Sequence, residues 1–450
     1  MKKAFSIILL PVLVAATAAS SFISGPFKLM ILVLSALLFF VAVVKTDMAL
    51  IILIFSMLFS PEFSLGGVSG RAVVVRFDDI FIFVIFFGWL AKMAINKELG
   101  LIRITFLNRP ILAYIAVYAI ATLIGLLMGP ISLKEGVFYL LKYFEYFLLF
   151  FMVSNCLNDK EQAAFFIRLI LFVGLAISIY ACWQHLTGVE RVSAPFEGEG
   201  GEANTLGGYL MMIILLSISL LLNTSGFKFK AFLYLIIFSA VPALLFTLSR
   251  SSWIAFAFGL LALIFLTTRG RVVLFVVFVA TIVLSSVIFP AFVINRVTST
   301  FESTNKYTVM NRHMSLDESA IARIESWHKA YRMIVKSPFI GHGASSAGPT
   351  VDNQYARILI EAGVLGLLAF IWMAMAILKN CFIYLNELKD DDFSRGFFAG
   401  FMAVFIALLV HSFGAASFIL IRIMEPFWFL MALVVVLAEN APFIKSSAGS

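Results

Sequence analysis

Apolar stretches close to the length that crosses a lipid bilayer follow one another along almost the whole chain. About 14 such runs occur, each near the roughly 20 residues that a transmembrane helix needs. They lie at about 4–22, 27–44, 48–60, 78–95, 110–128, 137–154, 163–183, 205–222, 231–248, 252–267, 272–290, 355–378, 397–413 and 426–438. Hydrophobic residues make up 62% of the sequence and charged residues only 13%, which excludes a soluble globular protein, a disordered chain and a nucleic-acid binder with a basic face. The pattern predicts an all-α polytopic membrane protein with about 12–14 transmembrane helices.

The long polar connections divide this bundle into segments. We expect N-terminal transmembrane helices at 1–183, a first long periplasmic loop at 184–204, central transmembrane helices at 205–290, a large periplasmic loop at 291–352 and C-terminal transmembrane helices at 353–450. The first apolar run also fits a signal peptide with a weak cleavage site at 16–18, but an uncleaved helix fits better because another crossing follows directly. Cys156, Cys182 and Cys381 form no CxxC pair, so neither a disulfide framework nor a thiolate metal site is indicated.

Lysine and arginine are distributed unevenly between the two sets of connections. With the N-terminus inside, the short connections that hold most of these residues are cytoplasmic, as the positive-inside rule requires. An even number of crossings then returns the C-terminus to the cytoplasm. The predicted cytoplasmic residues are Lys2, Lys3, Lys45, Lys97, Arg103, Arg109, Lys160, Lys228, Lys230, Arg269, Arg271, Lys379, Lys389, Arg395 and Lys445.

Several arginines nevertheless fall on the outer side. They are Arg71, Arg76, Arg191, Arg250, Arg296, Arg312, Arg323 and Arg332. Any one of them can be explained by contact with lipid headgroups. Together they favour an outward-facing anion site, because the guanidinium group binds phosphate in a bidentate manner.

The large outer loop contains a predicted amphipathic helix at about 317–336. Ser315 and Glu318 have capping-box spacing, and Ser337-Pro338 marks the end of the helix. Isoleucines and aromatic residues share one face and charged residues the other, so we expect the helix to lie on the outer membrane surface or at the mouth of the bundle. Arg323 falls beside the apolar face, which makes it a ligand candidate; an ion pair within the loop is the alternative.

Polar and glycine-rich motifs follow this helix. The glycines of 341–349 allow the backbone to approach a ligand or another segment closely. Asp352 begins the next crossing, where an aspartate is most often a helix cap. Glu361 is an intramembrane carboxylate and therefore a functional candidate. The sequence has no GxxxxGK[ST] or HExxH motif, and its five histidines lack metal-ligand spacing.

These elements occur in an order that resembles the O-antigen ligase/polymerase superfamily, which contains Wzy-type polymerases and WaaL-type ligases. The matching elements are Arg191 with Phe196 and the segment 202–206, in which Ala203 replaces the usual proline; the Ser-Arg turn within 247–253; Arg323 and Trp327 before Pro338, Gly341 and Gly343; Asp352-Asn353-Gln354-Tyr355; and Glu361 through Gly366. The segment 76–80 is also similar to a common family segment. The resemblance is strongest from Arg191 to Gly366.

The resemblance implies a glycosyl transfer at the periplasmic face of the bacterial cytoplasmic (inner) membrane. The donor would be an oligosaccharide on undecaprenyl diphosphate, and neither a metal nor a nucleotide cofactor is expected, because the donor carries its own leaving group. Partners would be this lipid-linked substrate and membrane lipids, with a chain-length regulator as a further candidate and no nucleic acid. Arginines would bind the diphosphate and stabilise the departing charge, and a base would deprotonate the acceptor hydroxyl.

The site that we predict has three parts. Arg191, Arg250 and Arg323 bind the diphosphate, with Arg332 or Arg76 in support. Asp352 or His342 is the catalytic base, unless Asp352 is only structural. Asn353, Tyr355 and Glu361 form the acceptor pocket.

One departure from the family affects the function. Ligases of this family typically carry histidine where this chain has Asp352, which weakens the ligase interpretation and favours a polymerase in O-antigen or exopolysaccharide assembly. A ligase that transfers glycan to lipid A-core or another acceptor remains an alternative. A polysaccharide transporter or flippase is the competing class, although its inverted repeats are not visible here.

Overall fold

The computed structural model describes most of the chain. The described residues are 26–68, 71–96, 102–129, 131–197, 202–284, 291–298, 306–309, 312–315, 318–388 and 391–440. The first predicted crossing at 4–22, the possible cleavage site at 16–18 and Asp317 of the capping box lie outside these residues.

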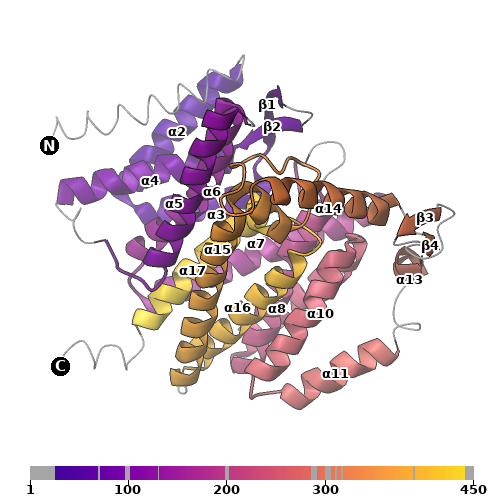
Figure 1. Ribbon diagram of the computed structural model, residues 1–450. Helices are drawn as coiled ribbons and strands as arrows, with labels where there is room; N and C mark the ends of the chain where they lie inside the picture. Colours follow the sequence, from indigo (N-terminus) through magenta and orange to yellow (C-terminus); the bar gives the residue numbers. More distant parts are fainter. Residues whose placement is uncertain are drawn as a thin grey trace.

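Eight described helices are long and apolar enough to cross a membrane. They are α5 (Asn108–Met128), α6 (Leu133–Cys156), α7 (Lys160–Leu186), α8 (Ala203–Asn223), α9 (Phe227–Phe246), α15 (Gln354–Glu387), α16 (Asp392–His411) and α17 (Ile421–Glu439). Further helices of the bundle are α2 (Pro26–Val44), α3 (Thr46–Phe59), α4 (Phe77–Asn96), α10 (Arg250–Leu266) and α11 (Arg271–Val283). The helices form one bundle (Figure 1), which confirms the prediction of an all-α, multi-pass membrane protein.

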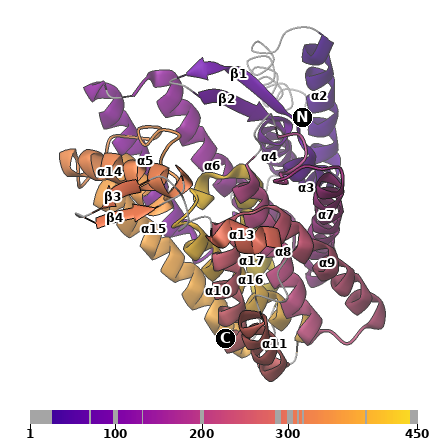
Figure 2. The same cartoon turned by 90° about the vertical axis from the view of Figure 1, so that its right-hand side faces the viewer.

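Two short β-hairpins interrupt the helical pattern at positions that the sequence analysis did not identify. Strands β1 (Glu62–Val68) and β2 (Arg71–Arg76) pair antiparallel between α3 and α4. Strands β3 (Lys306–Val309) and β4 (Arg312–Ser315) pair in the long connection between α11 and α15, after the short helix α13 (Ala291–Thr298). Figure 2 shows β3 and β4 beside α14 (Glu318–Lys336), whereas β1 and β2 lie at the top of that view.

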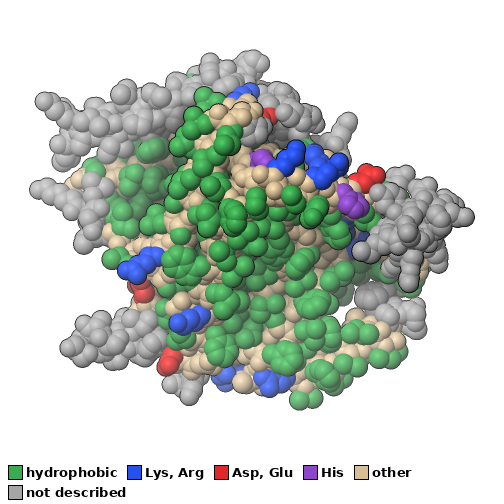
Figure 3. All heavy atoms as spheres, viewed as in Figure 1, with side chains coloured by type: hydrophobic (Ala, Val, Ile, Leu, Met, Phe, Trp, Pro, Cys, Tyr) green, Lys and Arg blue, Asp and Glu red, His purple; other side chains and the backbone are tan. Residues whose placement is uncertain are grey.

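Helices α8 and α17 form the centre of the bundle. Apart from Arg422 and Glu425 near the start of α17, both are apolar on nearly all sides, which is typical of a helix enclosed by others, and most of their residues are buried. Helix α8 packs against α9, α10 and α16, and α17 packs against α6. The outer surface is covered with hydrophobic side chains between charged groups at the two ends of the bundle (Figure 3), as expected for a surface that faces lipid.

Helix α14 lies across one end of the bundle (Figure 1) and begins and ends close to the bounds that the sequence predicts. Ala330 is buried and packs with Ala347, Val351 and Ile360. Trp327 and Tyr331, predicted to share one apolar face with Ile334, keep 52% and 68% of their surface exposed. The helix therefore leaves part of its apolar face uncovered by the rest of the protein.

Helix α15 is broken two turns after its start. Gly363 has φ 64° and ψ −163°, a conformation that is essentially restricted to glycine. The chain that follows α14 passes through this break, where the amides of His342 and Gly343 donate to carbonyls of α15 and the amide of Val364 donates to Pro338. A Cβ atom on Gly363 would lie 2.3 Å from the backbone of Phe339, so the glycines of this motif serve the close contact of two segments.

Ion pairs connect the helices at the opposite end of the bundle. Arg269 pairs with Asp392 at 2.6 Å, and Lys160 pairs with Asp391 at 2.5 Å. Burial raises the pKa of Asp391, but its hydrogen bonds with Lys160 and Ser394 outweigh this effect and leave the pKa below the ordinary value. These pairs involve connections that the sequence assigns to the cytoplasm.

Candidate functional site

An arginine-rich cavity of about 250 Å³ lies beneath α14, at the end of the bundle opposite these ion pairs. Four of its lining residues are arginines: Arg191, Arg250, Arg296 and Arg323. Of the described residues that line it, Asp352 is the one carboxylate. The lining therefore favours an anionic ligand over a metal cation.

The lining arginines come from segments that are far apart in the sequence. Arg191 lies in the connection between α7 and α8, Arg250 is the first residue of α10, Arg296 belongs to α13 and Arg323 to α14. Burial lowers the pKa of Arg191 below its ordinary value, and repulsion from the other three arginines adds to this effect. The four positive charges are thus close enough to interact, and a bound anion would relieve their repulsion.

The turn between α9 and α10 positions two of these arginines. The backbone of Leu248 adopts a positive φ of 50°, which is unfavourable for a residue with a branched side chain. This turn lets Ser249 cap α10 and directs the carbonyl of Thr247 toward Arg191 Nε at 3.1 Å. Such strain persists only where neighbouring contacts impose it and is often found at functional sites.

A chain of hydrogen bonds runs from the cavity into the core. Asn204 Oδ1 accepts from Ser249 Oγ at 2.7 Å and from Arg191 Nη2 at 3.4 Å. Ser249 Oγ is 2.8 Å from Ser252 Oγ, which is 3.0 Å from Nε2 of the buried His411. His411 is therefore a structural histidine that holds the start of α10.

Three helix N-termini converge on the cavity. Asn204 lies in the first turn of α8, Arg250 begins α10, and Asn353 caps α15 by accepting a hydrogen bond from the amide of Ala356. Helix N-termini carry partial positive charge and attract anions. The backbone thus reinforces the charge of the arginine side chains.

Aromatic contacts position Arg296. The ring of His185 stacks on Phe246 with centroids 3.7 Å apart, and Phe292 lies 5.8 Å from His185. Phe292 belongs to α13, one turn before Arg296. These contacts attach α13 to the outer ends of α7 and α9 and bring Arg296 to the cavity wall.

The start of α15 contributes the polar residues that face the arginines. Asp352 and Asn353 line the cavity, and Asn353 Nδ2 donates to the carbonyl of Phe413 at 3.2 Å. Tyr355 is not a lining residue; its hydroxyl donates to Leu409, and its ring lies 4.7 Å from that of Phe413, which does line the cavity. Tyr355 therefore supports the wall from behind.

Four predicted site residues lie elsewhere. Arg332 is exposed on α14. Arg76 pairs with Asp78 at 2.7 Å inside the N-terminal part of the bundle. His342 lies in the α15 break, and Glu361 is buried and bound to Tyr143 Oη at 2.8 Å. The structure brings together Arg191, Arg250, Arg323, Asp352 and Asn353, and it does not bring these four residues to the same cavity.

Arg296 was predicted to be one of the outer arginines but was not predicted to be a site residue. Arg296 is far in the sequence from the other motifs, and its position depends on the ring contacts of Phe292. No local sequence pattern indicates these contacts. Asn204 lies in the segment 202–206 that resembles the family. Its hydrogen bonds with Arg191 and Ser249 became visible only in the folded structure.

Comparison with known families agrees with this arrangement. Residues 233–371 match the family model described as O-Antigen ligase, a stretch from α9 to the middle of α15 that contains Arg250, Arg323 and Asp352. No curated protein matches the chain. Residues 233–371 are thus similar to an O-antigen ligase domain, which confirms the predicted resemblance to the O-antigen ligase/polymerase superfamily over this part of the chain.

Proposed function

We propose that the protein is a polysaccharide polymerase that joins oligosaccharide units carried on undecaprenyl diphosphate, at the periplasmic face of the bacterial inner membrane. The observation that carries this proposal is the cavity itself, in which four arginines and three helix N-termini surround a space faced by Asp352. A diphosphate is an anion of matching charge, and arginine binds it in a bidentate manner.

The reaction follows from the arrangement of charges. The acceptor hydroxyl loses its proton to Asp352 as its oxygen attacks the anomeric carbon of the donor sugar. The bond between that carbon and the diphosphate oxygen breaks, and the lipid diphosphate leaves with the electron pair. The arginines stabilise the negative charge that accumulates on the departing diphosphate. Hydrogen-bond donors placed where charge develops in the transition state accelerate a reaction in this way. Attack in line with the leaving group inverts the anomeric configuration.

The orientation in the membrane is part of the proposal. The cavity and the ion-paired connections lie at opposite ends of the bundle. Because the positive-inside rule assigns those connections to the cytoplasm, both termini are cytoplasmic and the cavity faces the periplasm.

Two other functions remain to be separated by experiment. The match to an O-Antigen ligase model supports a ligase as well as a polymerase. Aspartate at position 352 favours the polymerase. A transporter of the lipid-linked glycan would use the same anion-binding cavity without forming a covalent product.

The test uses the purified full-length protein with a lipid-linked repeat unit and follows product length on a gel. We expect a ladder of products from the wild type. Arg323→Ala should slow elongation by about 100-fold, because removal of one group that stabilises the developing charge typically costs 10²–10³ in rate. The matched control is Arg332→Ala, on the same helix but exposed, which should elongate at nearly the wild-type rate.

The other outcomes contradict the proposal in distinct ways. A single addition to a lipid A-core acceptor would identify a ligase, and binding without a covalent product would identify a transporter. Equal rates for Arg323→Ala and the wild type, with both proteins folded, would show that the cavity is not the site of reaction.

A further inference from the structure

A second cluster of ionisable side chains lies inside the bundle, outside the cavity. It joins the start of α4, the middle of α6 and the second turn of α17. Its members are at most 6% exposed: Arg76, Asp78, Asp79, Lys142, Glu145 and Glu425. Charges buried to this degree are costly unless they are paired and hydrogen-bonded.

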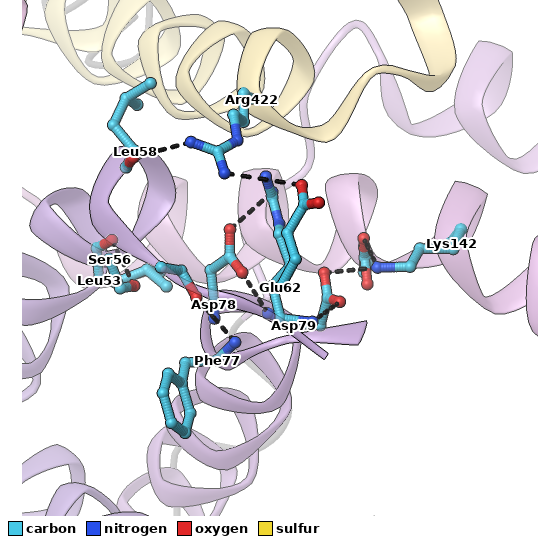
Figure 4. A network of polar contacts seen from close by, with 12 residues as sticks. Leu53, Ser56, Leu58, Glu62, Phe77, Asp78, Asp79, Lys142 and Arg422 are labelled. Atoms are coloured by element: carbon cyan, nitrogen blue, oxygen red, sulfur yellow. Dashed lines mark hydrogen bonds and ion pairs between the residues drawn. The ribbon is translucent and has the colours of Figure 1, made fainter. Parts of the chain in front are cut away.

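Most of the cluster is paired. Arg76 Nη2 lies 2.7 Å from Asp78, and Lys142 Nζ lies 2.5 Å from Asp79 and 3.3 Å from Glu145. The amide of Arg76 also donates to Asp79 Oδ2 at 2.8 Å. Figure 4 shows Lys142 pointing toward Asp79 and, nearby, Arg422 pointing toward Glu62 and the Leu58 carbonyl.

Glu425 is the exception. Its side chain is fully buried, and neither of its carboxylate oxygens has a hydrogen-bond partner among the described residues. One of these oxygens lies within 4.8 Å of an oxygen of Asp78 and an oxygen of Asp79. An ionised carboxylate in such a place would lack a donor and would repel two like charges, an arrangement that proteins avoid by neutralising the group.

The charge balance of the cluster also favours a neutral carboxyl group, because its carboxylates outnumber its cations. The carboxylates of Asp78, Asp79, Glu145 and Glu425 face the two cations Arg76 and Lys142. The next cation, Arg422, lies 3.6 Å from both Glu62 and Glu197, so it is opposed by two further carboxylates. Tyr146, the remaining titratable neighbour, donates its hydroxyl to the carbonyl of Ile419 and cannot also donate to Glu425.

We propose that this cluster is a proton-binding site in which Glu425 is protonated and donates a hydrogen bond to Asp78. The proton satisfies the unpartnered carboxyl and requires no added space. A metal cation fits less well, because Arg76 and Lys142 already bind Asp78 and Asp79 and would repel it. Calcium and magnesium also usually take six or more oxygen ligands, whereas this group offers three carboxylates.

The proton connects two parts of the fold. Asp78 lies in the first turn of α4, and Glu425 lies on α17, which follows the loop that carries the cavity residues Phe413 and Gly414. A hydrogen bond from Glu425 to Asp78 therefore holds α17 against α4, and α17 follows the loop that forms part of the cavity wall.

The experiment compares the full-length wild type with Glu425→Gln, because glutamine reproduces the shape and the donor of a protonated glutamate. Infrared difference spectra at neutral pH should show a protonated-carboxyl C=O band in the wild type that Glu425→Gln lacks. The melting temperatures of the two proteins should agree closely, with or without chelator. The control, Glu387→Gln, alters an exposed carboxylate on α15 and should leave the band unchanged.

Two results would overturn the assignment. If the wild-type spectrum contains no carboxyl band that Glu425→Gln removes, Glu425 is ionised. If millimolar Ca²⁺ or Mg²⁺ raises the melting temperature of the wild type but not that of Glu425→Gln, the cluster binds a metal cation in place of a proton.

Discussion

The cavity and the buried cluster are opposite in the sign of their charge. The cavity is lined by four arginines and one carboxylate, whereas the cluster has four carboxylates around two cations. The cavity opens between loops and helix ends, and the cluster is sealed between packed helices. The excess of one charge and the available space are the basis of the two proposals, a diphosphate in the cavity and a proton in the cluster.

The two regions should also differ in what they contribute. Substitution of a cavity arginine removes a contact to the proposed substrate, so it should reduce activity. It also relieves repulsion between like charges, so it should leave the fold intact. Substitutions in the cluster leave charges buried without partners, so they should reduce stability first. The following predictions test this distinction.

The largest effect is expected for Lys142→Met in the cluster. It leaves Asp79 and Glu145 without their cation, and breaking a buried ion pair in this way costs about 3–5 kcal/mol. Thermal unfolding in detergent measures the loss. Lys134→Met, at the exposed start of the same helix, is the control. Equal melting temperatures for the two variants would mean that the cluster is not a stabilising element.

A smaller effect in free energy is expected for Asp352→Asn in the cavity. Loss of a general base should lower the elongation rate by about 10²-fold or more, and the melting temperature should stay unchanged. His342→Gln should elongate at nearly the wild-type rate, because His342 is held against the Ile360 carbonyl in the α15 break. The reverse result would make His342 the base.

The smallest effect concerns Glu197, which lies beside Arg422 at the edge of the cluster. Burial raises the pKa of Glu197 to about 7, despite the opposing charge of Arg422. Because the pKa lies above the ordinary value for a glutamate, the folded protein retains a proton that the unfolded chain releases. Stability is therefore lost as the pH rises toward 7, by about 1–3 kcal/mol in total.

Melting temperatures at pH 5 and pH 8 check this sign. Glu197→Gln should match the wild type at pH 5 and exceed it at pH 8. Glu190→Gln, an exposed residue of the same loop, should follow the wild type at both values. A wild type that gains stability over Glu197→Gln as the pH rises would contradict the prediction.

The two regions were not equally accessible from the sequence. Arg250, Arg323 and Asp352 occur in ordered motifs, so their presence in one site was predictable once the crossings were counted. The bundle was predictable for a simpler reason, since the apolar run lengths follow directly from the thickness of a bilayer. Arg296 was not predictable, because the ring contact between Phe292 and His185 that positions it is a tertiary one.

The buried cluster and the α15 break depended on tertiary structure throughout. Asp78 and Glu425 belong to helices at opposite ends of the chain, and nothing in either segment indicates the other. The glycines of 341–349 were predicted to permit a close approach, but Gly363 and the backbone of Phe339 had to be seen together to identify the partner. Local patterns thus predicted which residues are unusual, and the fold decided which of them meet.

Helices α8, α10 and α15 all run away from the cavity toward the ion-paired end of the bundle. The number of crossings that precede them therefore determines which compartment the cavity opens into. Under the proposed function, an added or lost crossing upstream would leave every cavity residue in place and still deliver the product to the wrong side. The direction of synthesis would then be encoded at a distance, in the cationic connections that orient the chain under the positive-inside rule.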